Sequence, residues 1–318
     1  MAKSVRDAMT AVRRAQDDPQ LVSVITIFLN AEAFMEETIA SVRAQSWPHW
    51  ELLLVDDGSS DRSTAIAQEW SRREPGRIRY LEHPGHQNRG MSASRNRGLR
   101  EARGAFVALL DADDVWMPEK LEAQLGVMRA QPRAAMTYGR SEIWWSWSGR
   151  PEDQSRDHVL DLGVTPDTLV EPPALVRLLI ENRAQTPTTC NVLLRREAVD
   201  RLGGFDESFR GIFDDHVFFS KLGLEMPVFV SGARWARYRQ HPASACAIAA
   251  RDGSDRAARL RFMRWLRGYL EDRRVPDPTL RSLLEKEIWP LEHPVLERAS
   301  RRSRRLWKRV RRRIASWE

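Results

Sequence analysis

Three aspartates within four residues are the strongest candidate for chemistry in this sequence. Asp111, Asp113 and Asp114 directly follow an apolar run at residues 105–110. Carboxylates this close repel one another unless a cation joins them. Mg²⁺ and Mn²⁺ prefer oxygen ligands and commonly bind one or two carboxylates together with substrate phosphates. The pattern indicates a metal that bridges acidic side chains and a diphosphate; a solvated acidic turn that caps a helix is the alternative.

Two further pairs of acids lie at positions where a helix is expected to begin. Asp56 and Asp57 precede Gly58 at the end of an apolar run, where a carboxylate could accept hydrogen bonds from a nucleobase or a ribose. Asp214 and Asp215 open a predicted helix, where a carboxylate that faces a substrate could act as a general base. Each pair has a structural alternative, because acids at a helix start also cap it and stabilise its dipole.

An arginine and a histidine complete the set of candidate groups. Arg95 follows Gly90 at the beginning of a predicted helix, and a helix N-terminus with an added guanidinium suits an anion. His241 follows a predicted strand and would fit as a third metal ligand, although a lone histidine is more often structural. The ordinary interpretation of Arg95 is likewise a surface arginine on a capped helix.

The elements that must position these groups alternate along the first half of the chain. This alternation with short connections predicts an α/β fold with a mostly parallel sheet and helices on both faces. Ligands of such sheets bind outside the carboxyl ends of the strands, where both acidic clusters fall. The expected strands cover residues 22–28, 51–55, 77–81 and 105–110, and the expected helices cover about 32–44, capped by Asn30, 62–73, 92–103, ending at Gly104, and 118–129.

The second half alternates less regularly. Strand periodicity over residues 142–147 would place Trp145 and Trp147 on one face, where their rings could stack on an acceptor sugar. The other expected elements are strands at 134–138 and 188–194, a strand pair within 228–240, and helices at 171–181, 214–224, 255–272 and 278–289.

An ordered set of motifs in this sequence resembles glycosyltransferase family 2. The resemblance covers about residues 20–245 and implies the GT-A nucleotide-diphospho-sugar transferase fold, of the bacterial type, with inversion at the anomeric carbon and a Mn²⁺ or Mg²⁺ cofactor. The motifs are Val22-Ser-Val-Ile-Thr through Asn30, Val55-Asp-Asp-Gly-Ser-Ser-Asp61, Asn88-x-Gly90 with Ser94-Arg-Asn96, Leu110-Asp-Ala-Asp-Asp-Val-Trp-Met-Pro118, Gly203-Gly-Phe-Asp206 with Asp214-Asp215, and Tyr238-Arg-x-x-His241.

The resemblance implies a role for individual residues. Asp57 resembles the aspartate that contacts the nucleobase, Asp111 the acid that meets the ribose, and Asp113 the metal-binding acid. Asp215 resembles the usual base, with Asp214 as the alternative. The full predicted site comprises Phe28, Asn30, Glu32, Asp57, Arg95, Asp111 and Ala112 for the nucleotide sugar, Asp113, Asp114 and His241 for the metal, Asp215 and Asp214 for catalysis, and Trp145 and Trp147 for the acceptor.

The sequence also departs from the family pattern. Residues 27–30 are Ile-Phe-Leu-Asn where the family often has Pro-Thr-Tyr-Asn, and this leaves the base preference open. Asp214 stands where the family has a glutamate. The Gln-x-x-Arg-Trp motif of processive members is missing, which favours the addition of a single sugar.

Composition predicts how the chain is organised. Residues 298–318 contain ten Lys or Arg and one acid, which gives this tail a charge of +9. Because the whole chain carries +7, the remaining residues carry −2. Apolar residues of the tail recur on one face, which predicts a basic amphipathic helix suited to an anionic membrane surface; a helix docked on the body or a disordered end are the alternatives. We expect an extension at 1–20, a GT-A domain at 21–245 with a nucleotide-binding half (21–130) and an acceptor half (131–245), helices at 246–297, and the tail.

These features predict partners and a location. A UDP-sugar is the favoured donor, the acceptor is expected to be a cell-surface glycan or a lipid-linked precursor, and no specific nucleic acid is expected. Two cysteines without metal-ligand spacing, and no signal peptide or spanning segment, predict a cytoplasmic protein, peripheral on the inner face of the membrane. A nucleotidyltransferase would need a glycine-rich basic loop after the first strand, and a non-catalytic binding module would have lost the acids.

Overall fold

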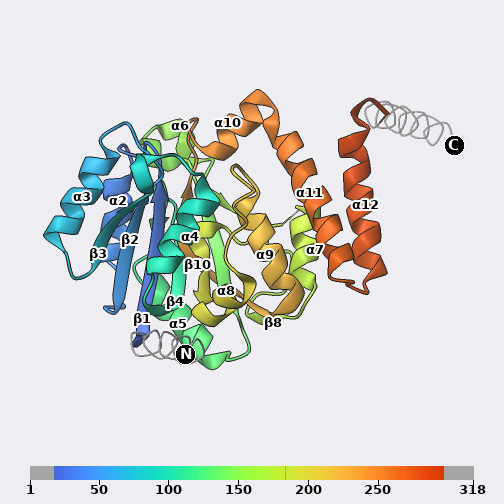
Figure 1. Ribbon diagram of the computed structural model, residues 1–318, viewed down its shortest axis with the longest axis horizontal. Coiled ribbons are helices and arrows are strands. Elements are labelled where there is room, and N and C mark those ends of the chain that lie inside the picture. The colour runs from blue at the N-terminus through green and yellow to red at the C-terminus, as the bar shows by residue number, and fades with distance from the viewer. Residues whose placement is uncertain (1–17, 183, 297–318) are drawn as a thin grey trace, which may run out of the picture. The chain divides into compact units, whose positions relative to one another are not determined.

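The computed structural model describes residues 18–182 and 184–296, and the chain divides into two compact units between Ile248 and Ala249. The first unit is an α/β domain with one large sheet, and the second contains a pair of helices (Figure 1). The predicted tail at 298–318 and most of the predicted extension at 1–20 lie outside the described residues.

The first half of the sheet is parallel, as the sequence predicts. Strand β1 pairs with β2 on one side and β4 on the other, and β3 pairs with β2. Phe28 is the register partner of Asp56, so the chain leaves both strands at the same edge. The strands are β1 (Asp18–Phe28), β2 (Trp50–Asp56), β3 (Ile78–Glu82) and β4 (Gly104–Leu109).

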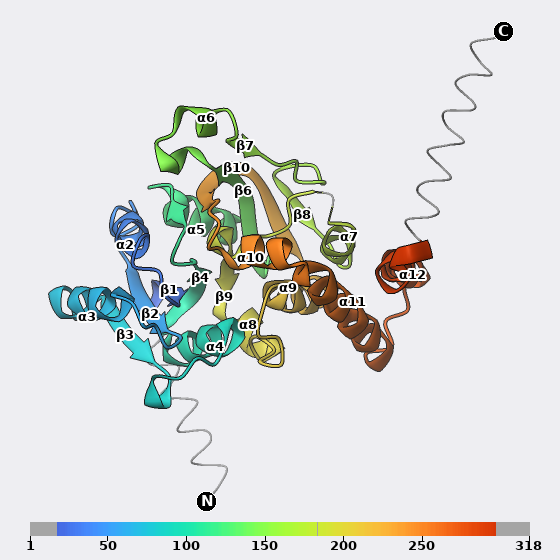
Figure 2. The ribbon, with the colours of Figure 1, turned by 90° about the horizontal axis from the view of Figure 1, so that it is seen from above.

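Helices cover both faces of this half, because successive strand residues point to opposite sides. Val22 and Val24 of β1 belong to a core that includes residues of α2, α3 and α5. Ile25 and Ile27 belong to a second core with residues of α4, α7, α8 and α9. The helices are α2 (Met35–Arg43), α3 (Ser63–Arg73), α4 (Met91–Glu101), α5 (Lys120–Ala130), α7 (Ala174–Glu181), α8 (Arg196–Leu202) and α9 (Asp214–Glu225), and the layers are visible from above in Figure 2.

The second half makes the sheet mixed. Strand β9 is antiparallel to β4 and β6, while β10 runs parallel to β6. The neighbours follow the order β3-β2-β1-β4-β9-β6-β10-β5, with β7 on β6 and β8 on β10. The bounds are β5 (Val115–Trp116), β6 (Met136–Trp144), β7 (His158–Val159), β8 (Thr168–Val170), β9 (Leu193–Arg195) and β10 (Val228–Arg239), with short helices α6 (Pro151–Gln154) and α10 (Ala245–Asp252).

Several predicted boundaries were wrong for local reasons. Asn30 does not cap the first helix, which begins at Met35; it has a positive φ of 53° and bonds to a neighbouring loop instead. Gly104 begins β4 rather than ending α4. The strand pair expected within 228–240 is the single strand β10, in which register shifts take the place of a turn. Residues 134–144 likewise contain one strand, β6, that ends at Trp144.

The second unit contains a pair of helices joined by a short turn. Helices α11 (Ser254–Asp272) and α12 (Pro278–Glu292) bury Phe262, Leu266 and Leu284. Ion pairs such as Arg264 with Glu292 at 2.9 Å link their exposed faces. No helix within residues 18–182 and 184–296 combines the length and apolar character that a membrane crossing requires.

Candidate active site

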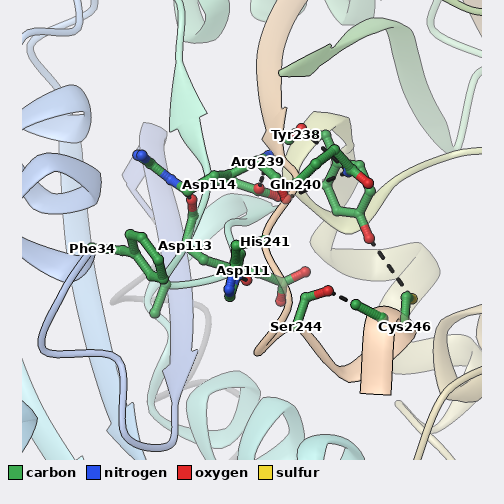
Figure 3. A network of polar contacts seen from close by, with 12 residues as sticks. Phe34, Asp111, Asp113, Asp114, Tyr238, Arg239, Gln240, His241, Ser244 and Cys246 are labelled. Atoms are coloured by element: carbon green, nitrogen blue, oxygen red, sulfur yellow. Dashed lines mark hydrogen bonds and ion pairs between the residues drawn. The ribbon is translucent and has the colours of Figure 1, made fainter. Parts of the chain in front are cut away.

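The acid row, defined here as residues 111–114, directly follows β4 at the edge where the parallel strands end. Its backbone is fixed by neighbouring elements, because the Thr38 hydroxyl of α2 donates to the carbonyls of Ala112 and Asp114 at 2.9 Å each. Figure 3 shows the row facing the end of β10 and the residues that follow it. These hydrogen bonds hold the backbone of the acid row in place. The side chains of the row then lie in different environments.

Asp113 and His241 form the first pair that the sequence predicts and the structure brings together. The Asp113 Oδ2 lies 3.0 Å from the His241 Nε2, and the Asp113 side chain is 28% exposed. A carboxylate and an imidazole are ligands for divalent cations such as Mn²⁺. Within the described parts of the chain no group of three such side chains is gathered, so any metal here would complete its coordination with substrate or solvent oxygens.

Arg239 determines where Asp113 lies. This arginine is 3% exposed, and its Nε donates to the Asp113 carbonyl at 2.6 Å while its Nη2 donates to Glu37 at 2.5 Å. Its guanidinium also lies over the rings of Trp144 and Phe34, at 4.5 and 4.9 Å from their centroids. The Asp113 carboxylate is left out of this network and remains available to His241.

Asp114, which the sequence predicts as a metal ligand, is buried rather than open to a metal. Its residue is 0% exposed, and its Oδ1 accepts from the backbone N–H of Arg239 at 2.9 Å. Burial, with the charges of Asp113 and Asp111, raises the pKa of Asp114 well above its ordinary value. This burial argues against metal ligation by Asp114 and in favour of a role in joining the acid row to β10.

Arg95, expected to bind an anion of the nucleotide sugar, already has partners within the protein. It is 3% exposed and lies between two carboxylates, donating to Asp111 at 3.0 Å and making a close ion pair with Asp214. The Thr189 hydroxyl donates to the other oxygen of Asp111. The guanidinium is therefore committed to side chains of the protein, and it joins the acid row to the first turn of α9.

The two acids of α9 have opposite electrostatic environments. Burial raises the pKa of Asp214 to about 6, against the opposing charge of Arg95. Burial also acts on Asp215, but the charge and hydrogen bonds of His216, together with Arg95, lower its pKa below the ordinary value. The Asp215 Oδ1 accepts from the His216 backbone N–H at 2.8 Å and lies 3.0 Å from its Nδ1. Asp215 thus stays ionised to a lower pH than Asp214 does.

Asp57, expected at the nucleobase, is held by donors of its own chain. Its carboxylate accepts from the backbone N–H groups of Arg89 and Gly90, at 2.7 and 3.0 Å, and from the Ser94 hydroxyl at 3.0 Å. The loops meet closely here, since a Cβ on Gly58 would lie 2.9 Å from the backbone of residues 86 and 88. Asp57 therefore shapes the start of α4.

The predicted nucleotide residues after β1 also bond to a neighbouring loop. Asn30 Oδ1 accepts from the backbone N–H of Ser60 at 2.8 Å, and Glu32 Oε2 accepts from that of Arg62 at 2.9 Å. Phe28 is buried, and its carbonyl accepts from the backbone N–H of Asp57 at 2.9 Å. These residues build the edge of the sheet, and any nucleotide contact of theirs stays a prediction.

The tryptophans predicted for an acceptor do not share a strand face. After β6 ends, the chain turns into a 3-10 helix at Ser146–Ser148, because Asp157 accepts from the backbone N–H groups of Trp145 and Ser146. The Trp145 ring lies beneath Arg156, 3.3 Å from its guanidinium carbon. The Trp147 ring instead contacts Phe34 edge-on and lies 6.4 Å from the His241 ring. Only Trp147 therefore belongs to the surroundings of Asp113.

Sequence reasoning missed three side chains of this site. Arg239 stands inside the motif that identified His241, but its buried position between β10 and α2 carries no sequence signal. Glu37 and Thr189 come from a helix and a 3-10 turn distant in sequence. Only the arrangement of the sheet, with β10 lying near the acid row, could reveal these contacts.

The fold matches solved glycosyltransferases. Staphylococcus aureus TarS (residues 1–349, in complex with UDP-GlcNAc) superimposes with a TM-score of 0.62 at 18% identity, over 86% of this chain and 73% of TarS. The mannosyltransferase PcManGT of Pyrobaculum calidifontis, in complex with GDP-Man and Mn²⁺, gives 0.56 at 19% identity, over 85% and 69%. The domain thus has the α/β architecture of GT-A glycosyltransferases, which confirms the predicted fold class.

The sequence matches define the family. The family model described as glycosyl transferase family 2 matches residues 23–203, more than half of the chain, and the chain belongs to this family. Bacillus subtilis TuaG, named as a teichuronic acid biosynthesis glycosyltransferase, is 45% identical over 42% of this chain and 51% of its own. Escherichia coli WfgD, named as a β-1,3-glucosyltransferase, is 38% identical over 40% and 47%. The chain spans about half the length of these curated relatives.

Proposed function

We propose that the chain is an inverting, metal-dependent glycosyltransferase that moves one sugar from a nucleotide-diphosphate sugar to a hydroxyl acceptor. One observation carries this proposal: Arg95 joins Asp111 of the acid row to Asp214 at the start of α9. The residues suited to a metal-bound donor and the residues suited to a base thereby meet at one place. The family supports the class of reaction, and the roles below are our proposal.

Asp113 and His241 would hold the cation, with Mn²⁺ favoured over Mg²⁺ because an imidazole suits a transition metal better. When bound, the ion would act as a Lewis acid on the diphosphate leaving group. The protein supports this arrangement by holding the Asp113 backbone through Arg239. Asp111 keeps Arg95 and Thr189 as partners and would meet the ribose from there.

Asp215 would act as the general base. Its lowered pKa keeps the carboxylate ionised, and its side chain is 23% exposed, whereas the Asp214 side chain is 4% exposed and paired with Arg95. The acceptor oxygen would attack the anomeric carbon on the face opposite the diphosphate, while its proton passes to Asp215. The new bond joins the acceptor oxygen to that carbon, and the bond from the carbon to the diphosphate oxygen breaks. The transition state would resemble an oxocarbenium ion, as in other glycosyl transfers.

The donor and the acceptor are inferred from the similar proteins. Two of the solved structures were obtained with UDP and UDP-GlcNAc and a third with GDP-Man, and WfgD is named for UDP-Glc and a diphosphoundecaprenol acceptor. We therefore favour a UDP-sugar and a cell-surface glycan or lipid-linked acceptor. The basic tail at 298–318 would bring the enzyme to the inner face of the membrane; unchanged binding to anionic vesicles after its deletion would reject that part.

Calorimetric titration with UDP, GDP and dTDP, each with Mn²⁺ and with EDTA, tests the proposal. We expect Mn²⁺-dependent binding of one nucleotide, lost in Asp113→Asn and retained in the control Asp200→Asn, whose side chain is 59% exposed on α8. No binding of any nucleotide by the folded protein would instead favour a non-catalytic module.

A further inference from the structure

A pocket of about 440 Å³ lies against a face of α4 that the proposed reaction does not use. Ala93, Arg97 and Arg100 line it, and their spacing of four and three residues places them on one side of the helix. No member of the acid row borders the pocket. Its polar walls are Glu82, His83, Arg89, Arg97, Arg100 and Glu207.

The three arginines of this pocket are incompletely neutralised. Arg97 pairs with Glu101 at 3.2 Å, but its buried Nε has no hydrogen-bond partner. Arg89 and Arg100 also line the pocket, and both are exposed. Like charges gathered in one pocket repel one another unless an anion joins them. Because they are exposed, Arg89 and Arg100 remain accessible to an anion in this pocket.

The two carboxylates of the pocket do not neutralise these arginines. Glu82 accepts from the Tyr80 hydroxyl at 2.8 Å and pairs with His86 at 3.0 Å, and Glu207 accepts from the Asn96 amide at 2.9 Å. A carboxylate oxygen has several acceptor sites, so each group can still accept from a ligand hydroxyl. The pocket thus offers guanidinium donors and carboxylate acceptors together.

His83 provides a second sign that the three charges converge. The residue is 5% exposed, and its Nε2 lies 2.8 Å from the Ser94 Oγ. Burial lowers its pKa; Asp57 opposes that shift, while Arg89, Arg97 and Arg100 add to it. The imidazole therefore lies near all three arginines, and also near Asp57, whose Oδ1 is 3.7 Å from its Nε2.

We propose that this pocket binds the phosphomonoester of a small polyhydroxylated molecule, a sugar phosphate in chemical class. Guanidinium groups bind phosphate oxygens through paired donors, and carboxylates accept from sugar hydroxyls. The volume lies within the range of small-molecule sites. The proposal goes beyond the transferase reaction, because this pocket needs neither a metal nor a nucleotide.

Titration calorimetry with glucose 1-phosphate in EDTA tests this site. We expect one binding site on the wild-type protein, at least a tenfold lower affinity in the Arg97→Gln/Arg100→Gln double variant, and unchanged affinity in Arg103→Gln. Arg103 follows the same helix, is exposed and does not line the pocket, so it controls for loss of charge alone. Circular dichroism would establish that the variants are folded.

Two further arms separate binding in this pocket from binding at the acid row and from general attraction of anions. Asp113→Asn should bind glucose 1-phosphate as the wild type does, since the acid row takes no part. Inorganic phosphate and glucose should each bind at least tenfold more weakly than the phosphate ester. Equal affinity in the double variant, an equal loss in Arg103→Gln, a loss in Asp113→Asn, or no binding by the wild type would overturn the proposal.

Discussion

Two buried arginines contact different members of the acid row, and their guanidinium groups have different partners. Arg95 spends its charge on two carboxylates, Asp111 and Asp214. Arg239 makes a side-chain ion pair only with Glu37 among the described residues, and reaches Asp113 through the backbone carbonyl. The Asp111 and Asp214 carboxylates are thus neutralised by an arginine, while the Asp113 carboxylate contacts His241 instead. We infer that Arg95 is a structural crosslink and that Arg239 positions the ligand-bearing side.

The largest effect on activity is expected at Asp215 of α9, which forms no ion pair with Arg95. Asp215→Asn removes the proposed base, so kcat should fall roughly 10²–10⁴-fold. The affinity for the nucleotide should change little, because Asp215 lies outside the proposed ligand pair of Asp113 and His241. Measurements of sugar transfer and of nucleotide binding on the same preparation separate the two effects.

A loss of nucleotide binding in Asp215→Asn would contradict its role as base. The conservative change to Asn keeps the size of the side chain and an acceptor for the His216 N–H. A general loss of structure is therefore not the expected cause of inactivity, and the unfolding midpoint of the variant provides that control.

Substitution of Arg95 should chiefly lower the free energy of unfolding. Arg95→Gln leaves Asp111 and Asp214 without their buried countercharge, and breaking such a pair costs about 3–5 kcal/mol in the free energy of unfolding. Urea denaturation measures this value. Arg97→Gln, on the same helix but with a side chain 33% exposed, should change it by less than about 1 kcal/mol. A small effect of Arg95→Gln would remove its assignment as a crosslink.

Substitution of Arg239 should chiefly lower the Mn²⁺-dependent affinity for the nucleotide. Arg239→Gln frees the Asp113 carbonyl and the packing on Trp144, so Mn²⁺-dependent nucleotide affinity should fall about 10–100-fold, as for other groups that orient metal ligands. Glu37→Gln is the matched control: its side chain is 54% exposed, and it removes one ion pair without touching Asp113. Equal losses in both variants would mean that the Glu37 pair, rather than the contact with Asp113, is what matters.

The two halves of the sheet differ in how well the sequence predicts them. The parallel half follows from hydrophobic runs that alternate with helical segments, and each predicted strand there lies within two residues of its observed bounds except at the start of β1. The second half depends on long-range pairing. Nothing local shows that β10 continues through register shifts, or that Asp157 ends β6 by accepting from the next two N–H groups.

For the site, the motifs predicted which side chains would meet better than how each one would be buried and paired. Asp113 and His241 meet as expected, since both follow strands at one edge of the sheet. Asp114 and Arg95 carry the expected chemical groups but are buried by elements far away in sequence: β10 for Asp114 and α9 for Arg95. Burial and partner choice depend on tertiary packing, and a motif does not encode them.

The smallest effect, on pH dependence, distinguishes the two acids of α9. The pKa of Asp214 is raised from 3.8 to about 6 in the folded protein, so the unfolded chain loses this proton first as the pH rises. The contribution of Asp214 to stability is therefore fully present below pH 4 and lost by about pH 6. Relative to Asp214→Asn, which cannot titrate, the wild type should lose roughly 1.4 kcal/mol of unfolding free energy for each unit of pH over this range.

Asp215→Asn is the control, because its effect on the unfolding free energy should change with pH in the opposite direction. Because the folded-state pKa of Asp215 is lowered, its contribution is present above pH 4 and lost as the pH falls through the lowered value. Urea denaturation in EDTA at several pH values between 3 and 7 measures both differences. A difference for Asp214→Asn that stays constant or grows with pH would show that Arg95 keeps Asp214 ionised, and the contrast between the two acids would then rest on exposure alone.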